Sequence, residues 1–303
     1  MKCTVCREPA LIDLRRHNAN FCAEHLVRFC QDQVQRAVED FGMLQPGDKV
    51  LVAVSGGKDS LALWHILAEA GYDTTGVYVG LGIGDYSDTS GNFVRTFATE
   101  RGLNLTEVDL RGEHGYDIPT AADATRRSPC SSCGLSKRHV FDRAAIDGGF
   151  DALATGHNLD DEAAVLLGNV LRWQMDYLAR QRPVLEAREG LPRKVKPLVR
   201  LTEREMAAYC VVVGIDYQVE ECPMAAGNKH LAFKELLNEL EVRSPGSKAD
   251  FYLSFQRRAA PLLEPTLTSG RESLTPCGEC GSPSPSEICA FCRLKSLSSR
   301  ESA

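Results

Sequence analysis

The chain has 303 residues, of which 43% are hydrophobic and 25% charged, the ordinary balance of a globular protein. This balance excludes disordered and collagen-like architectures, and no apolar run is long enough to predict a membrane span. The formal net charge of -6 argues against indiscriminate nucleic-acid binding, although a local basic surface remains compatible with it. The first residues lack the apolar stretch of a secretory signal, so we expect a cytosolic protein.

Strand and helix signals alternate along the middle of the chain. A helical apolar face spans residues 23–41, and further helices are expected at 60–70, from Leu135, from Asp160, at 229–240 and at 247–263. One more helix, with a capping box at Thr202 and Glu205, precedes residue 215. Strands are predicted at 49–54, 75–81, 103–110, 151–155 and 215–219. This order predicts an α/β fold with a Rossmann-like, doubly wound parallel sheet.

The first predicted strand runs directly into Ser55-Gly56-Gly57-Lys58-Asp59-Ser60 and then into a helix. At such a junction, free backbone N–H groups and the helix dipole favour an anion. The glycines allow close approach to a phosphate, while the serines and Lys58 add donors and charge. The spacing matches neither the Walker pattern nor the dinucleotide pattern. A plain strand-to-helix turn is the structural alternative.

A second polar segment, Gly156-His157-Asn158-Leu159-Asp160-Asp161, ends the fourth predicted strand and opens a helix. Because ligands of an open parallel sheet bind outside the carboxyl ends of its strands, this turn is expected to face the same crevice. We also expect Asp160 and Asp161 to cap the helix. We assign no proton transfer to His157.

Twelve cysteines in a cytosolic chain indicate metal or redox chemistry rather than a disulfide framework. Two sets near the chain ends have the spacing of tetrahedral zinc ligands, and their segments lack the apolar residues to fold without a metal. They are Cys3, Cys6, Cys22 and His25, and Cys277, Cys280, Cys289 and Cys292. We therefore predict a zinc finger over 1–30, a catalytic domain over 31–265, and a zinc ribbon with a tail over 266–303.

A third set consists of Cys130, Cys133 and the distant Cys222. Three thiolates can hold a [4Fe–4S] cluster with one iron open, or carry out persulfide and disulfide chemistry. Purely structural cysteines are the remaining alternative. The two cysteines outside all three sets, Cys30 and Cys210, are expected to be buried small hydrophobes.

Basic residues are concentrated in the segment 171–204, which holds nine Lys or Arg against four acidic residues. Arg126, Arg127, Lys137 and Arg138 flank the central cysteines. Contacts from these residues to phosphates would position an RNA by its shape. A solvated charged face is the alternative interpretation of such a run.

These motifs together resemble a known family. Residues 55–60 match the SGGxDS loop of the PP-loop (adenine nucleotide alpha hydrolase) superfamily, whose members cleave ATP between the α and β phosphates. With the segments SPCSSCGLSKR, GHNLDDEA and ECP and the two terminal ligand sets, the chain resembles the tRNA 2-thiouridine synthetases. It is most similar to their TtuA type, which thiolates the uridine at position 54. The type that acts on the wobble uridine at position 34 shares the layout and is the alternative.

The resemblance implies a cytoplasmic ATP-dependent tRNA 2-sulfurtransferase that uses ATP with Mg²⁺ and adenylates the base. It implies two zinc ions and a [4Fe–4S] cluster on Cys130, Cys133 and Cys222, with the transferred sulfur on the open iron. It further implies a ubiquitin-like sulfur-carrier protein thiocarboxylate as donor, and a homodimer. Asp59, Lys137 and Asp161 are the catalytic candidates. The implied ATP contacts are Ala53, Ser55, Gly56, Gly57, Lys58, Asp59, Ser60, Val79, Lys137, Gly156 and Asp161.

Two other function classes remain open at this point. One is a PP-loop ligase that forms an amide, which would not need Cys130, Cys133 and Cys222. The other is a non-enzymatic, zinc-dependent RNA or protein adaptor with a relic nucleotide fold. Cluster absorbance argues against the first, and tRNA-stimulated conversion of ATP to AMP argues against the second.

Overall fold

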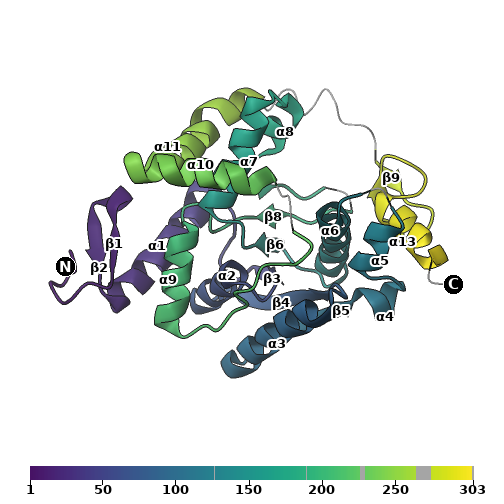
Figure 1. The fold of residues 1–303 in the computed structure, drawn as a ribbon, viewed down its shortest axis with the longest axis horizontal. Coiled ribbons are helices and arrows are strands. Elements are labelled where there is room, and N and C mark those ends of the chain that lie inside the picture. The colour runs from purple at the N-terminus through teal and green to yellow at the C-terminus, as the bar shows by residue number, and fades with distance from the viewer. Residues whose placement is uncertain (126, 189, 226–228, 264–273, 302–303) are drawn as a thin grey trace.

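A computed structural model describes residues 1–125, 127–188, 190–225, 229–263 and 274–301. Its centre is a six-stranded sheet with the strand order β5-β4-β3-β6-β8-β7 (Figure 1). All neighbouring strands are parallel except β7 and β8. The strands are β3 (Lys49–Val54), β4 (Asp73–Gly80), β5 (Asn104–Asp109), β6 (Ala152–Thr155), β7 (Val184–Leu185) and β8 (Lys194–Val195). The predicted α/β fold with a mostly parallel sheet is confirmed.

Helices cover both faces of this sheet, which is why its central strands are apolar on both sides. On β3, Val50, Val52 and Val54 belong to the apolar core on the side of α2 (Lys58–Glu69) and α3 (Gly84–Arg101). Leu51 packs on the opposite side with Ala145 of α6 (Pro129–Asp147). The helix α6 therefore lies on the opposite face of the sheet from α2, the helix that follows the phosphate loop.

The remaining helices frame these layers (Figure 1). Helical turns continue from α11 through a π-helical segment, Phe255–Ala259, to residue 263. In the part of the chain that is described, no helix is long and apolar enough to cross a membrane. The helices are α1 (Ala23–Phe41), α4 (Leu110–His114), α5 (Ile118–Asp123), α7 (Leu159–Leu171), α8 (Met175–Arg180), α9 (Glu203–Val213), α10 (Lys229–Arg243), α11 (Ser247–Ser254) and α13 (Ala290–Glu301).

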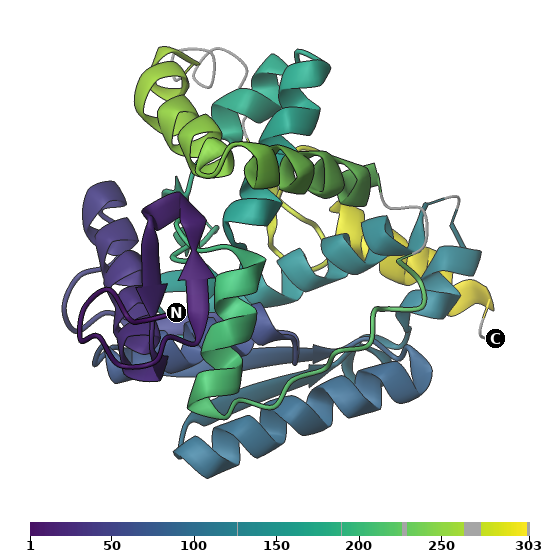
Figure 2. The same ribbon diagram turned by 60° about the vertical axis from the view of Figure 1, so that its left-hand side comes forward.

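The two ends of the chain lie on opposite sides of the sheet (Figures 1 and 2). At the N-terminus, the hairpin of β1 (Ile12–Leu14) and β2 (Ala19–Phe21) contributes apolar side chains to the main core. At the C-terminus, β9 (Thr275–Pro276) pairs with β10 (Pro283–Ser284), and α13 contacts α5 and α6. The predicted boundary at residue 30 lies within α1, which runs unbroken through it, and the predicted boundary at residue 265 lies outside the described residues. The domain limits therefore stay a prediction.

The four leading predicted strands are confirmed, and so is the capping box at the start of α9. The predicted strand at 215–219 is wrong, because this segment crosses the phosphate loop, where the backbone N–H of Gln218 donates to the Gly56 carbonyl (2.9 Å). The sheet is instead completed by β8 and β7, whose two residues each are too few for a periodic signal.

Candidate active site

The loop after β3 forms an open turn that its own serines hold in place. Gly56 has φ +79°, which glycine adopts without strain, and a Cβ there would lie 2.7 Å from the Ser90 carbonyl oxygen. The Ser60 hydroxyl accepts from the Ser55 N–H (3.1 Å) and donates to the Gly57 carbonyl (3.0 Å). Because α2 begins directly after Gly57, its unpaired N–H groups and dipole favour an anion in this turn.

A cavity of about 270 Å³ opens beside this loop. It is formed by the β3–α2 turn, the end of β6 and one face of α6, so three segments distant in sequence meet here. Gly156 is required at the β6 end, since a Cβ would come within 2.9 Å of the Ser60 nitrogen. The lining residues are Ala53, Val54, Ser55, Gly57, Asp59, Ser60, Lys137, Phe141, Thr155, Gly156 and His157.

Four of the expected nucleotide contacts lie outside this lining. Gly56 and Lys58 belong to the loop itself. Val79, near the end of β4, is buried in the apolar cluster that also contains Tyr116. Asp161 lies in the first turn of the next helix, where its carboxylate contacts Asn158 and Lys234. The roles of these four residues stay predictions, as do those of the expected contacts that line the cavity.

Asp59 is the one carboxylate among the described residues that line the cavity. Its Oδ2 lies 3.0 Å from the Lys58 ammonium, and its Oδ1 accepts from the Asn158 side-chain amide at 3.1 Å. Burial raises the pKa of Asp59, with Lys58 opposing it. Burial lowers the pKa of Lys58, but the neighbouring Asp59 outweighs this and raises it. The pair places a hard oxygen ligand, of the kind Mg²⁺ takes, beside the anion turn.

Asp161 is the third residue of α7 and completes a capping box at its start. The cap is Asn158, whose Oδ1 accepts from the Asp161 N–H, while Asp161 accepts from the Asn158 N–H, both at 3.1 Å. The expectation that Asp160 and Asp161 cap this helix is therefore confirmed for Asp161, the capping-box partner of Asn158. It is wrong for Asp160, whose Oδ2 accepts from the Glu203 N–H at the start of α9. Asp161 also lies 2.6 Å from the ammonium of Lys234 on α10, whose pKa it raises against the effect of burial.

Sequence reasoning missed two partners in this network, Asn158 and Lys234. Asn158 lay inside the quoted motif, and its position before a helix is a cap signal, but its bond to Asp59 crosses 99 residues. Lys234 had no signal at all, because only the tertiary fold brings α10 against α7.

The first two central cysteines lie in the opening turn of α6. That helix begins at Pro129, with Ser128 as its cap, so the expectation that it runs from Leu135 is wrong. The Ser-Pro pair is itself a start signal, since serine caps and proline suits the first helical position. Cys130 and Cys133 are thus one turn apart on one face, at a helix end whose dipole favours thiolates.

The third central cysteine reaches this turn from the segment after α9, which runs beside α3 towards the start of α6 (Figure 2). Cys130 Sγ lies 3.8 Å from the Met224 carbonyl oxygen, two residues beyond Cys222. Cys133 and Cys222 pack against the same apolar cluster. Burial raises the pKa of Cys133, with Lys137 opposing it. In the described part of the chain, the sulfur atoms of these three thiols are not all within 4.8 Å of one another, whereas the ligand atoms of each terminal set are. The three sulfur atoms are therefore farther apart than the ligands of one tetrahedral ion.

Most of the basic side chains in the segment 171–204 form ion pairs or hydrogen bonds with other parts of the chain. Lys194 pairs with Asp142, and Lys196 pairs with the buried Glu162. Four arginines hydrogen-bond to main-chain carbonyls or to an aspartate: Arg172, Arg182, Arg193 and Arg200. Within the described part of this segment, the exposed Arg180, Arg188 and Arg204 are the arginines whose guanidinium groups have no such partner. Arg126, at the central cysteines, lies outside the described residues, whereas Arg127 and Arg138 there are exposed.

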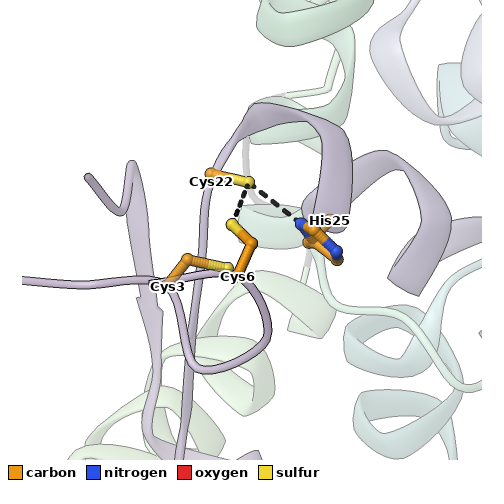
Figure 3. A group of neighbouring side chains, drawn as sticks. All are labelled: Cys3, Cys6, Cys22 and His25. Carbon is orange, nitrogen blue, oxygen red and sulfur yellow. Dashed lines mark hydrogen bonds between the residues drawn. The ribbon is translucent and has the colours of Figure 1, made fainter. Parts of the chain in front are cut away.

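The N-terminal ligand set converges on one point (Figure 3). The four ligand atoms of Cys3, Cys6, Cys22 and His25 all lie within 4.8 Å of one another. The Sγ atoms of Cys6 and Cys22 are 3.7 Å apart, close to the ~3.8 Å edge of a zinc tetrahedron with 2.3 Å bonds. Burial raises the pKa of Cys3, but backbone N–H groups of Cys6 and Cys22 bring it down to about 6. The set thus fits a zinc ion.

The C-terminal ligand set has the same geometry. The four Sγ atoms lie within 4.8 Å of one another, with Cys280 and Cys289 3.7 Å apart. This module docks on α6 through Phe291, whose ring stacks on His139 at 3.8 Å between centroids. The four thiols are those of Cys277, Cys280, Cys289 and Cys292.

The parallel sheet, the glycine turn and the cavity at the carboxyl ends of its strands define a nucleotide-binding protein of the PP-loop class. Residues 26–226 match the PP-loop domain family, and residues 2–27 match the N-terminal LIM domain of 2-thiouridine synthetase TtuA. The chain belongs to the TtuA family of PP-loop 2-thiouridine synthetases, and it is an enzyme of the sulfurtransferase class.

Relatives match this chain over nearly its whole length. The tRNA-5-methyluridine(54) 2-sulfurtransferase of Thermus thermophilus is 45% identical over 97% of this chain and 91% of its own. The enzyme of the same name from Pyrococcus horikoshii is 40% identical over 98% and 94%. A solved structure, the U34-tRNA thiolase NcsA from Methanococcus maripaludis with its [4Fe-4S] cluster, is 26% identical. It superimposes with a TM-score of 0.77 over 87% of this chain and 88% of its own.

Proposed function

We propose that this chain uses ATP to place sulfur on C2 of a uridine in tRNA, at position 54 of the ribothymidine loop. The observation that carries the proposal is the shared helix α6. Its Lys137 lines the cavity beside the phosphate loop, and its first turn holds Cys130 and Cys133. One rigid element thus links the nucleotide cavity to a group of three thiols, which a plain ATPase or an amide-forming ligase does not need.

The chemistry explains why both parts are required. A uracil C2 carbonyl is a poor electrophile because it lacks a leaving group. In the proposed first step, the O2 oxygen attacks the α phosphorus of ATP, and the bond to pyrophosphate breaks. A sulfur nucleophile then attacks C2, and AMP leaves with the former O2 oxygen. The base gains a C–S bond and loses a C–O bond, with no net oxidation.

Each group in the cavity has a role in this sequence. The N–H groups at the start of α2 and the Lys58 ammonium receive the departing pyrophosphate. Asp59 and Asp161 would hold a Mg²⁺ ion that accompanies the nucleotide, and Asn158 fixes the orientation of Asp59 by its 3.1 Å hydrogen bond. Lys137, which lines the cavity from α6, stabilises charge at the α phosphate.

The central cysteines suit a [4Fe–4S] cluster better than a single metal ion. Their spacing exceeds what one tetrahedral ion spans, three thiolates leave one iron open, and the apolar cluster beside Cys133 and Cys222 limits water. When bound, such a cluster would supply the transferred sulfur from the open iron. The role of this chain is to hold Cys130 and Cys133 at a helix N-terminus, where thiolates are favoured.

The remaining cofactors and partners follow from the family. The 3.7 Å sulfur separations support one zinc ion at each chain end, where the metal would supply folding energy. A thiocarboxylate on a ubiquitin-like carrier protein is the proposed sulfur source, and a cytoplasmic homodimer is the proposed assembly. Exposed Arg127 and Arg138 beside the thiols, together with Arg180, Arg188 and Arg204, are the proposed phosphate contacts for tRNA.

The wobble uridine at position 34 is the second candidate target. A 28% identical relative from Haloferax volcanii is a tRNA 2-thiolation protein, and the solved structure similar to this chain is a U34-tRNA thiolase. Relatives named for position 54 are 38–45% identical over comparable lengths. The higher identity over the full chain favours position 54.

Anaerobic reconstitution tests the proposal directly. The zinc-loaded protein is assayed for thiolation of a tRNA transcript before and after incubation with iron and sulfide. We expect activity only after reconstitution, and we expect Cys130→Ala, Cys133→Ala and Cys222→Ala to lose bound iron and thiolation while still binding ATP. Cys30→Ala is the matched control, because that thiol is fully buried on α1 outside the group and should retain both. Equal activity without iron would leave the three thiols as redox or persulfide groups.

A second assay addresses the other function classes. Conversion of ATP to AMP that tRNA stimulates would exclude a non-enzymatic adaptor. AMP formation that requires an amine and no iron would indicate the ligase instead.

A further inference from the structure

The segment 215–225, which we call the strap, contains Cys222 and also contacts the phosphate loop. It follows α9 and runs beside α3 (Figure 2). The backbone N–H of Gln218 donates to the Gly56 carbonyl at 2.9 Å. Four residues further on, the strap carries Cys222 to the central cysteines. One short, continuous stretch of chain therefore joins the two halves of the site.

The hydrogen bond to the Gly56 carbonyl affects the direction in which the phosphate loop points its backbone N–H groups. In a trans peptide, the carbonyl of one residue and the N–H of the next point in opposite directions. Holding the Gly56 carbonyl towards the strap therefore aims the Gly57 N–H away from it. Gly57 lines the nucleotide cavity, and no protein acceptor for its N–H lies in the described part of the chain. Gln218 thus orients a free N–H donor of the phosphate loop.

The side chain of Gln218 fixes the strap to α3. Its amide lies 3.0 Å from the Ser90 hydroxyl, which is also 2.9 Å from the Tyr86 carbonyl. A serine hydroxyl has one proton, so it donates to only one of these neighbours. In either orientation of the Gln218 amide, one of its two polar atoms stays buried without a partner among the described residues. A buried polar group that costs stability calls for a functional explanation.

The other end of the strap meets the same helix. Tyr86, one turn before Ser90 on α3, packs against the same apolar cluster as Cys222 and Cys133. The strap is therefore held on α3 at two neighbouring turns. One turn faces the phosphate loop and the other faces the central thiols.

We propose that Gln218 is a positioning residue that couples the phosphate loop to Cys222, so that bound nucleotide and the thiol at 222 affect each other. The proposal rests on the proposed function insofar as it requires ATP in the cavity. Because such coupling is reciprocal, nucleotide that draws on the Gly57 N–H changes the strap, and a change at Cys222 alters nucleotide affinity. Gln218 itself touches neither phosphate nor sulfur in this role.

The test measures the thiol rather than the reaction. Full-length, zinc-loaded protein without iron is alkylated with iodoacetamide, with and without a saturating non-hydrolysable ATP analogue and Mg²⁺. The rate at Cys222 is followed by peptide mass spectrometry, and analogue affinity is measured by calorimetry. In the wild type we expect nucleotide to change the Cys222 rate by about fivefold or more, at the lower end of ordinary couplings. In Gln218→Leu, nucleotide should change the Cys222 alkylation rate by less than about twofold. The analogue should still bind this variant, but with lower affinity than it binds the wild type.

Two further variants separate coupling from loss of packing. Ser90→Ala should weaken the coupling, and combining it with Gln218→Leu should add little, because both remove the same bond. Gln181→Leu is the matched control: this glutamine is equally buried and hydrogen-bonds to Asn169 and Glu162 away from the loop. It should lower stability and leave the coupling unchanged.

The outcomes distinguish the two proposals. An analogue that binds the wild type while the Cys222 rate stays constant refutes the coupling and leaves the proposed function intact. A Gln218→Leu variant with a wild-type response refutes the role of this residue. A wild type that binds no nucleotide refutes the proposed function, and the coupling with it.

Discussion

The buried ion pair between Arg16 and Glu205 gives the most quantitative prediction. Arg16 lies in the short turn Arg15–His17 of the N-terminal module and donates to both Glu205 oxygens, at 2.9 and 2.6 Å, and to the Arg200 carbonyl. The two side chains are only 9% and 1% exposed. This pair fastens the predicted zinc finger to α9, so its loss should cost far more than a surface pair.

Arg16→Leu would leave the Glu205 carboxylate buried without its partner. Breaking a buried pair from one side costs about 3–5 kcal/mol. Glu205 keeps the hydrogen bond from the Thr202 N–H at 2.8 Å, so we expect a loss near the lower end, about 3 kcal/mol. Adding Glu205→Gln removes the stranded charge while keeping that bond, and should recover part of the loss.

Denaturant unfolding of the purified variants checks this expectation, and the neighbouring residue provides the control. Arg15 is 71% exposed and 3.6 Å from a half-exposed Asp13, so Arg15→Leu should cost at most about 0.5 kcal/mol. An Arg16→Leu protein within about 1 kcal/mol of the wild type would show that the pair does not hold the module in place.

Three more predictions address the site and its surroundings. Asp59→Ala should reduce AMP formation by about 10²–10³-fold through loss of Mg²⁺ positioning, whereas Asp73→Ala, exposed at the opposite end of the sheet, should not; equal rates would refute the assignment. Elemental analysis should find two zinc ions per chain, and one or none would show that a ligand set is misassigned. Burial lowers the pKa of His65, so the unfolded chain binds the extra proton. Stability should fall as pH drops below about 6.5, and less so in His65→Gln.

What the sequence could predict is local. The strand at 49–54, the glycine turn after it and the zinc spacings each lie within a few residues, and the structure confirms the strand and the convergence of both ligand sets. The start of α6 was also encoded locally, in Ser128 and Pro129, although the helix was expected six residues later.

What the sequence could not predict depends on tertiary contacts. The apolar residues at 215–219 suggest a strand, but the fold places this segment over the phosphate loop, where Gln218 pairs with Gly56. The basic run at 171–204 suggests RNA contacts throughout, yet Lys194 and Lys196 pair with carboxylates more than 30 residues away. Charge along the chain does not reveal which cations the fold itself neutralises.

The most direct test of the central claim is nucleoside analysis of tRNA by mass spectrometry. Total tRNA from a strain that lacks this gene is compared with tRNA from the same strain carrying the wild-type gene. We predict that the 2-thiolated nucleoside of position 54 disappears in the deletion and returns with the wild-type gene. An unchanged level of that nucleoside, or loss of thiolation at position 34 instead, would contradict it.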